Sequence, residues 1–258
     1  TVNPFNVSEL ASALQGIDIP VFVKNPIHPE LSLWKGALER FSKAGITKLG
    51  AIHRGFHTYE KKKYRNAPFW QIPLELKSEF PQLPLICDPS HIGGTRDLIE
   101  PLAQRALDLD YDGVMIEAHT DPTHALSDAE QQVSTSTLLE IVSNLKPRDA
   151  SFTEKSYLDQ LEVIREKIDQ ADRELLEAIA VRMSLVEKIG EFKKENNVAI
   201  FQISRWKEIF KSRSEWGKQL NLDDEFTVDL LRLLHQQSVK KQTEVFNMIE
   251  DEQNHSNE

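Results

Sequence analysis

A long helical pattern runs from residue 157 to about residue 196, and it constrains the fold more than any other feature of the sequence. No proline interrupts it, and apolar residues recur at steps of three and four, as in an amphipathic helix. These apolar positions are Leu161, Ile164, Ile168, Leu175, Ile179, Met183 and Val186. With Thr153 capping its start, the predicted helix would contain about 44 residues and span about 66 Å.

Two further helices are predicted after this one, at Gln202–Lys218 and Asp223–Glu250. Together they are too short to cover an apolar stripe of that length. The simplest way to bury the remaining apolar surface is a second copy of the chain. We therefore expect the helical region to form a homodimer.

The first part of the chain has a different pattern, in which short apolar runs alternate with helical segments. The predicted strands are Ile19–Lys24, Ile46–His53, Leu83–Asp88 and Gly113–His119. The predicted helices begin near Pro4 and continue with Leu31–Ala44, Leu74–Phe80, Thr95–Asp110 and Ser134–Asn144. Alternating βα units form a parallel sheet covered by helices. Four units fit a small doubly wound sheet or part of a (β/α)8 barrel, because a whole barrel usually needs about 250 residues.

The predicted fold class is therefore α/β plus all-α. We expect an α/β domain at residues 1–147, a polar linker at 148–156, a helical domain at 157–250 and a disordered tail at 251–258. The net charge of −10 disfavours binding to nucleic acid or to a membrane surface. No apolar run approaches the roughly 18 to 20 residues of a membrane span. The single cysteine, Cys87, excludes an internal disulfide and fits a reducing cytoplasm.

Polar residues follow each predicted strand of the α/β domain, where reactive groups gather in βα folds. Lys24 and Arg54 lie at the ends of two neighbouring strands and could hold a phosphate or a carboxylate. His91 and Glu117 lie at the ends of the next two strands, Asp128 lies in the loop after the last of them, and the three could share a divalent metal ion. The alternative is that these are ordinary polar residues at strand ends.

Basic residues interrupt the apolar stripes of the helical domain. Arg165, Arg182 and Lys193 are 17 and 11 residues apart on the long helix, which places them roughly on one face, and Arg205 lies on the next helix. A basic row on an apolar side is costly unless an anion is held there. The alternative is a solvated face, with glutamates such as Glu166 as partners along the helix. Periodicity alone does not decide between them.

Four motifs of the α/β domain, VFVKNP, AIHRGF, CDPSHIGG and MIEAHTDPTHALSDAEQQ, resemble type I-beta DAHP (3-deoxy-arabino-heptulosonate 7-phosphate) synthases. The resemblance covers residues 1–145 and implies a TIM barrel. It also implies an aldol-type transfer between phosphoenolpyruvate and erythrose 4-phosphate. By residue-wise carry-over, Lys24 and Arg54 would bind phosphoenolpyruvate, and His91, Glu117 and Asp128 would bind a divalent metal. Mn, Co, Zn and Fe are not distinguishable.

The sequence also departs from that family. The family's metal-binding cysteine in a GPCS-like motif and its KPRTS-like sugar-phosphate loop do not occur here. The first residues resemble the segment after the family's fourth strand, so we expect only the C-terminal half of the barrel. On this expectation, synthase activity would require the remaining half.

The segment IREKIDQADRELLEAIAVRMSLVEKIGEFKK and the later SVKKQ resemble the all-helical chorismate mutases, isomerases that convert chorismate to prephenate without a cofactor. The resemblance covers residues 156–249. It implies that Lys193 and Gln242 donate to the substrate ether oxygen, with Arg182 holding the reactive conformer. Substrate-binding roles would fall on Arg165, Arg205, Gln202 and Ser238, with Arg165 reaching into the site of the partner.

Two positions differ from the mutase pattern. Trp206 stands where the family usually has an acid that contacts the substrate hydroxyl, and Gln202 replaces a common aspartate. The resulting hypothesis is a bifunctional enzyme of aromatic amino-acid biosynthesis. The alternative is that the helical domain binds prephenate or chorismate chiefly to regulate the synthase.

Overall fold

The chain divides into two compact units, Thr1–Phe152 and Thr153–Glu258. The computed structural model describes residues 4–58, 63–149, 151 and 155–255. The division falls within the predicted linker, of which residues 150 and 152–154 lie outside the described residues.

A parallel sheet of four strands forms the centre of the first unit, in the order β1-β2-β3-β4. The strands are β1 (Val21–Lys24), β2 (Leu49–His53), β3 (Leu85–Cys87) and β4 (Gly113–Val114). Register pairs such as Val23 with Ala51 and Cys87 with Val114 align the carboxyl ends of the strands at one edge. This is the arrangement of four consecutive strands of a (β/α)8 barrel.

The fourth strand is much shorter than predicted. Met115 still donates its amide to the Cys87 carbonyl of β3, but the Glu117 amide donates to the Ser90 hydroxyl. The chain has therefore left the sheet before Glu117, and the prediction of a strand to His119 was wrong.

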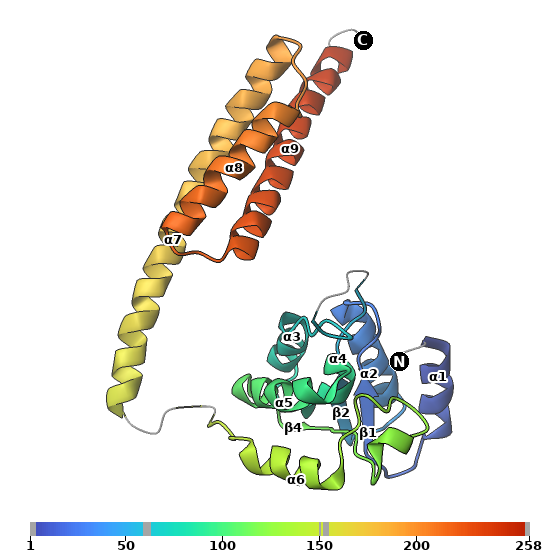
Figure 1. Cartoon of the computed structure of the whole chain (residues 1–258). Helices are drawn as coiled ribbons and strands as arrows, with labels where there is room; N and C mark the ends of the chain where they lie inside the picture. The colour runs from blue at the N-terminus through green and yellow to red at the C-terminus, as the bar shows by residue number, and fades with distance from the viewer. Residues whose placement is uncertain (1–3, 59–62, 150, 152–154, 256–258) are drawn as a thin grey trace. The chain divides into compact units, whose positions relative to one another are not determined.

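Helices surround the sheet (Figure 1). They are α1 (Pro4–Ala13), α2 (Leu31–Lys43), α3 (Gln71–Glu79), α4 (Pro89–Gly93), α5 (Ile99–Asp108) and α6 (Thr135–Asn144), with 3-10 turns η1 (Arg96–Leu98) and η2 (Pro122–His124). The predicted helix at Thr95–Asp110 is thus a 3-10 turn followed by α5. The core contains Trp34, which is fully buried and donates its indole N–H to the Val23 carbonyl at 3.0 Å. Cys87 is also fully buried in this core.

The second unit consists of three helices, α7 (Lys155–Glu195), α8 (Ile203–Gln219) and α9 (Asp224–His255). Asp223 precedes α9 and accepts from the Phe226 amide at 2.8 Å, as a helix cap does. Gly217 lets α8 approach α9 closely, because a Cβ there would lie 2.7 Å from the Thr227 side chain. The last helix continues to His255, so residues 251–255 are helical where a disordered tail was predicted; residues 256–258 of that tail lie outside the described residues.

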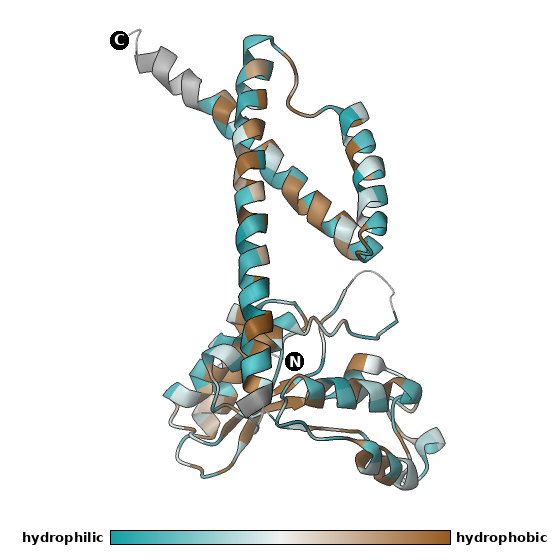
Figure 2. Cartoon of the chain, turned by 90° about the vertical axis from the view of Figure 1, so that its left-hand side faces the viewer, coloured by the Kyte–Doolittle hydropathy of each residue, from teal (hydrophilic) through white to brown (hydrophobic). Residues whose placement is uncertain are grey.

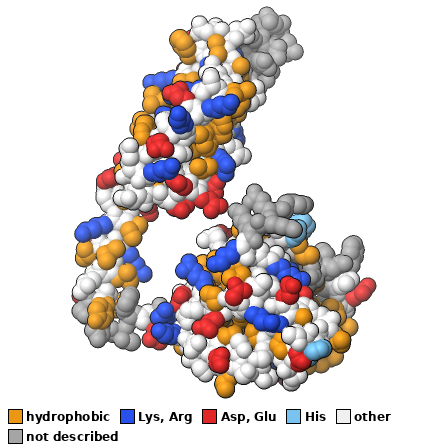
Figure 3. Space-filling view, viewed as in Figure 1, with side chains coloured by type: hydrophobic (Ala, Val, Ile, Leu, Met, Phe, Trp, Pro, Cys, Tyr) orange, Lys and Arg blue, Asp and Glu red, His pale blue; other side chains and the backbone are white. Residues whose placement is uncertain are grey.

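Most of the apolar stripe on the first half of α7 is exposed. Figure 1 shows this half extending beyond α8 and α9, and Figure 2 shows hydrophobic residues recurring along the helix. Between residues 157 and 180, only Leu161 and Ile179 are partly buried. Figure 3 shows hydrophobic side chains on this surface. None of the described helices is long and apolar enough to cross a membrane.

Candidate active sites

Charged residues meet at the carboxyl edge of the sheet in the first unit. The ammonium of Lys24, which ends β1, lies 3.0 Å from Oδ2 of the fully buried Asp88, which follows β3. His91 on α4 places its Nδ1 2.8 Å from the same oxygen and 3.7 Å from Oε1 of Glu117. Asp88 also caps α4 by accepting from the His91 amide. The short helix therefore fixes the histidine against the two carboxylates.

A second group of side chains extends this sheet-edge cluster. Arg65 contacts Asp128 Oδ1 at 2.8 Å and the buried amide of Gln131 at 2.5 Å. Gln131 in turn donates to Glu117 Oε2 at 2.8 Å. Of the predicted set, His91, Glu117 and Asp128 each place a ligand atom within 4.8 Å of the others. One imidazole and two carboxylates at this separation fit a divalent metal ion.

Electrostatics within the cluster favour ionised groups. Burial by itself would raise the pKa of the Asp88 carboxyl, but the hydrogen bond and charge of His91 and the charge of Lys24 hold it below its ordinary value. Burial lowers the pKa of the Arg54 guanidinium, and the nearby charge of Asp88 opposes that effect. The backbone amide of Arg54 donates to Oδ1 of Asn25 at 2.7 Å, which fixes the backbone just after β2. Both predicted anion-binding residues therefore interact electrostatically with Asp88.

His53 lies next to Arg54 in the sequence but belongs to the core. It is fully buried, its Nδ1 lies 3.0 Å from the Tyr111 hydroxyl, and its ring packs edge-on against Trp70. Burial lowers the pKa of His53 to about 3, so the ring is neutral. It supports the sheet edge without facing a ligand.

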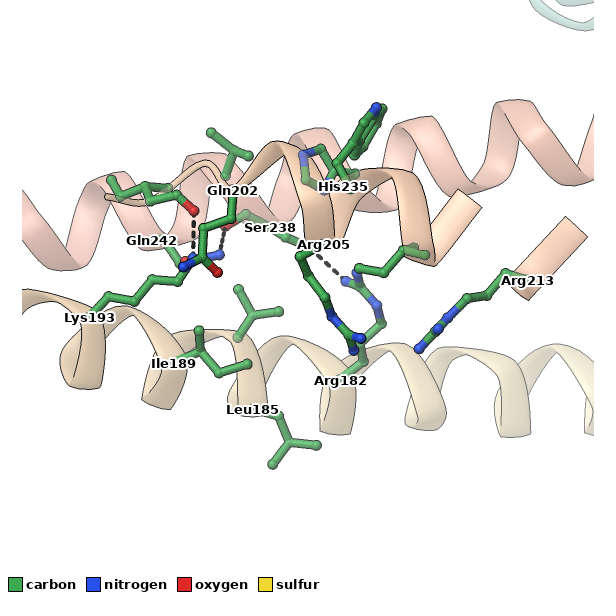
Figure 4. Close-up of a pocket in the computed structure, with 15 residues that line it drawn as sticks. Arg182, Leu185, Ile189, Lys193, Gln202, Arg205, Arg213, His235, Ser238 and Gln242 are labelled. Carbon is green, nitrogen blue, oxygen red and sulfur yellow. Dashed lines mark hydrogen bonds between the residues drawn. The ribbon is translucent and has the colours of Figure 1, made fainter. Parts of the chain in front are cut away.

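A cavity of about 360 Å³ lies among the three helices of the second unit (Figure 4). Six of the seven predicted mutase residues line it: Arg182, Lys193, Gln202, Arg205, Ser238 and Gln242. Apolar side chains from each helix, such as Leu185 and Ile209, complete the walls. The alternative of a solvated basic face fits Arg205, which is exposed and pairs with Glu208 at 2.7 Å, but not the partly buried Arg182 and Lys193.

Hydrogen bonds orient the polar groups of this helical pocket. Arg182 donates to the Ser238 hydroxyl at 2.8 Å, which links α7 to α9. Lys193 donates to the Ile200 carbonyl at 2.5 Å and keeps two further ammonium protons. Gln242 donates to the Ser238 carbonyl at 3.3 Å, while its buried Oε1 has no protein partner. Lys193 and Gln242 therefore both retain polar capacity for a ligand.

The helical pocket is strongly cationic. Two arginines and a lysine from the predicted set are joined by Arg213, and no carboxylate is among the described residues that line the cavity. Burial lowers the pKa of both Arg182 and Lys193. Burial, together with the charges of Arg182 and Lys193, also lowers the pKa of His235. Such a pocket is complementary to a small anion.

Arg165 is the predicted residue that does not line the cavity. Its side chain is mostly exposed on the first half of α7 and pairs with Glu162 at 2.8 Å. Trp206 forms part of the wall instead of presenting an acid, with its ring centroid 3.8 Å from that of His235 and 4.1 Å from that of Phe210. The pocket therefore lacks an acid at this position.

Sequence reasoning missed Arg213 and His235 in the pocket, and Arg65 and Gln131 in the sheet-edge cluster. Helical spacing could have found the first two. Arg213 lies eight residues after Arg205 on α8, and His235 lies three and seven residues before Ser238 and Gln242 on α9. Arg65 and Gln131 lie in irregular segments, which carry no periodic signal.

Comparison with known proteins assigns a family to each of the two units. The model of the DAHP synthetase I family matches residues 2–151, and that of type II chorismate mutases matches residues 164–243. A chorismate mutase from Methanocaldococcus jannaschii is 30% identical over 87 residues, which are 33% of this chain and 88% of that protein. The chain belongs to the DAHP synthetase I family and, through its helical unit, to the type II chorismate mutases.

The relatives of the DAHP synthetase region are longer than the matched segment. A phospho-2-dehydro-3-deoxyheptonate aldolase from Thermotoga maritima is 32% identical over 127 residues, which are 49% of this chain but 37% of that protein. The solved truncated form of 3-deoxy-D-arabino-heptulosonate 7-phosphate synthase from the same organism aligns with a TM-score of 0.50 and 29% identity. That alignment covers 55% of this chain and 54% of the other. The first unit thus corresponds to about half of a DAHP synthase barrel.

Proposed function

We propose that the helical unit is a chorismate mutase. The observation that carries the proposal is the cavity itself, in which Arg182, Lys193 and Arg205 converge with no lining carboxylate among the described residues. Chorismate carries two carboxylates and an ether oxygen, so it needs cations at its ends and donors between them. The helical pocket offers both.

The reaction requires positioning and electrostatic stabilisation, without a nucleophile or a proton transfer. Arginines hold the compact conformer in which the two reacting carbons are close. Negative charge accumulates on the ether oxygen as its bond to carbon breaks. The unused ammonium protons of Lys193 and the second amide proton of Gln242 stabilise that charge.

A direct assay tests this proposal. Purified chain is mixed with chorismate, and the loss of chorismate is followed together with the appearance of prephenate. We expect saturable turnover without added metal. Absence of turnover, combined with tight binding of prephenate, would instead support the alternative of a regulatory binding module.

We also propose that the helical unit acts as a homodimer. The exposed apolar residues of α7 need a partner, and Ile164, Ile168 and Leu175 are each more than half exposed in the single chain. A second copy would cover them and would bring its Arg165 towards this pocket. Sedimentation of Leu175→Glu at micromolar concentration tests this: wild type should be a dimer, and the variant should dissociate.

For the first unit, we propose the phosphoenolpyruvate and metal half of a DAHP synthase site. Lys24 and Arg54 would bind phosphoenolpyruvate, and His91, Glu117 and Asp128 would hold the divalent metal. When bound, the metal would polarise the aldehyde of erythrose 4-phosphate as a Lewis acid. Asp88 would pair with Lys24 and hold His91 in place.

Binding measurements test the proposed synthase half-site without requiring a complete barrel. Calorimetric titration with Mn²⁺ and then with phosphoenolpyruvate should show both ligands bound by wild type. The variant Lys24→Ala should lose phosphoenolpyruvate binding and keep the metal, whereas Lys63→Ala, outside the cluster, should keep both.

We further propose a cytoplasmic location, where phosphoenolpyruvate and erythrose 4-phosphate are present.

A further inference from the structure

Arg213 is a cation of the helical pocket to which the mutase resemblance gives no role. It lies on α8, two turns after Arg205, and its side chain is partly buried. Figure 4 shows it reaching from α8 towards α7, where Arg182 projects. Three guanidinium groups therefore gather at one end of the cavity, and Lys193 lies with Gln242 at the other.

The contacts of Arg213 leave its charge without a counter-ion. It donates to the hydroxyl of Ser212 at 2.8 Å and lies 4.7 Å from the ring centroid of Trp216. In the described parts of the chain no carboxylate pairs with it. Arg165 and Arg232, which face solvent, each pair with an acid three residues away. Arg205 of the pocket also pairs with an acid, Glu208, at 2.7 Å, so Arg182 and Arg213 are the arginines of the described cavity lining that have no acidic partner.

The position of Arg213 against Arg182 is costly without an anion. Arg182 is itself partly buried and unpaired in the described residues, and its donors go to the neutral Ser238 and Leu234 oxygens. The charge of Arg213 adds to burial in lowering the pKa of Arg182, so the two guanidinium groups interact unfavourably. A carboxylate between them would remove this repulsion and accept charge-assisted hydrogen bonds from both.

We propose that Arg213 is a substrate-binding residue that, with Arg182, clamps one carboxylate of a dicarboxylate ligand. This inference rests on the proposed mutase function for the identity of the ligand. In this arrangement, Arg182 on α7 and Arg213 on α8 of the same chain form the clamp. Arg165 of a second copy would contribute a further cation. Because the carboxylate is present in substrate and transition state alike, the clamp acts chiefly on binding.

Mutase kinetics of the full chain test the role of Arg213. Arg213→Met keeps the aliphatic stem on Trp216 and removes the guanidinium, and Arg213→Lys keeps the charge without the fork. Arg232→Met on α9 is the matched control. We expect Arg213→Met to raise KM about 10- to 100-fold, the loss of a hydrogen bond to a charged group, with kcat within a few-fold. Arg213→Lys should recover part of the loss. A KM within twofold of wild type for Arg213→Met, with an unchanged melting temperature, would overturn the proposal.

A titration with prephenate separates this inference from the mutase assignment. If wild type does not convert chorismate but binds prephenate, and Arg213→Met weakens that binding, the clamp stands and the mutase proposal fails. If wild type is active and Arg213→Met neither raises KM nor weakens prephenate binding, only the clamp fails. Should Arg213→Met prove unstable by circular dichroism, Arg213→Lys decides: unchanged KM and prephenate affinity in this variant would exclude bidentate binding by Arg213.

Discussion

The sheet-edge cluster and the helical pocket differ in whether their cations are paired with acids. In the cluster, Lys24 and His91 lie against Asp88, and Arg65 lies against Asp128, so cations and anions neutralise one another. In the pocket, Arg182 and Lys193 have no acidic partner among the described residues and use neutral oxygens instead. Both groups lie in partly buried surroundings, so solvent exposure does not explain the contrast.

The difference reflects what each site can bind. A metal ion needs carboxylates, and those carboxylates need nearby cations to stay ionised and fixed while the protein folds. A dianion needs the reverse, a set of cations whose charge is left uncompensated by the protein. The paired cluster therefore suits a metal with an anionic substrate, and the unpaired pocket suits a dicarboxylate alone.

The largest effect is expected when the pocket loses Lys193, the cation that lies beside Gln242. Lys193→Ala should lower kcat about 10²- to 10³-fold, as the loss of one preorganised donor does in other enzymes. Helical content should stay unchanged, because the ammonium only contacts a loop carbonyl. Lys188→Ala, an exposed neighbour on α7, is the control. Near-normal turnover in Lys193→Ala would contradict the mutase assignment. It would also contradict the contrast between the paired cluster and the pocket.

Removing one of the three proposed metal ligands should affect only the cluster. His91→Ala should weaken Mn²⁺ binding more than the roughly 10- to 100-fold lost with an outer-shell partner. His124→Ala, an exposed histidine beside Asp121, is the matched control. Calorimetry measures the affinity, and a parallel mutase assay should show no change in either variant. Equal Mn²⁺ affinity in His91→Ala and wild type would show that the proposed metal site is wrong.

The elements of the helical unit could be predicted to within a few residues, because apolar spacing and capping are local signals. The end of β4 could not, because the hydroxyl that takes the Glu117 amide belongs to Ser90, far away in the sequence. The tail was assigned by polarity alone, and a polar segment can continue an existing helix such as α9 without any core to bury.

The two sites were predictable to different degrees. Strand ends placed His91, Glu117 and Asp128 at one edge, and their ligand atoms do lie within 4.8 Å of one another. Periodicity left the basic residues of the helices ambiguous until the mutase resemblance separated Arg182, which lines the cavity, from Arg165, which does not. Which arginines pair with an acid follows a local pattern, because Arg165, Arg205 and Arg232 each pair with an acid three residues away on the same helix. That Arg182 and Arg213, unpaired among the described residues, line one cavity depends on packing between helices, which no local pattern contains.

A smaller effect is expected from the neutral partner of Arg182. Ser238→Ala removes the hydroxyl that orients the guanidinium across α7 and α9. We expect KM to rise about tenfold, near the lower limit for a hydrogen bond to a charged group, with kcat less affected. Thr243→Ala on the same helix, whose hydroxyl bonds only to the Val239 carbonyl, is the control. If both variants behave alike, orientation of Arg182 by Ser238 is unimportant.

The smallest effect concerns pH, and it tests whether the unpaired ammonium is the active form. Burial disfavours the charged state of Lys193 and lowers its pKa below the ordinary 10.5. The proton is therefore lost at a lower pH than from a free lysine, and kcat/KM, which reports the free enzyme, should fall as pH rises through that lowered pKa. Lys193→Arg keeps its charge over this range, so whatever activity it retains should show no such decline. A wild-type profile that stays flat up to pH 10.5, or the same decline in Lys193→Arg, would mean that another group titrates and that the charge on Lys193 does not limit the reaction.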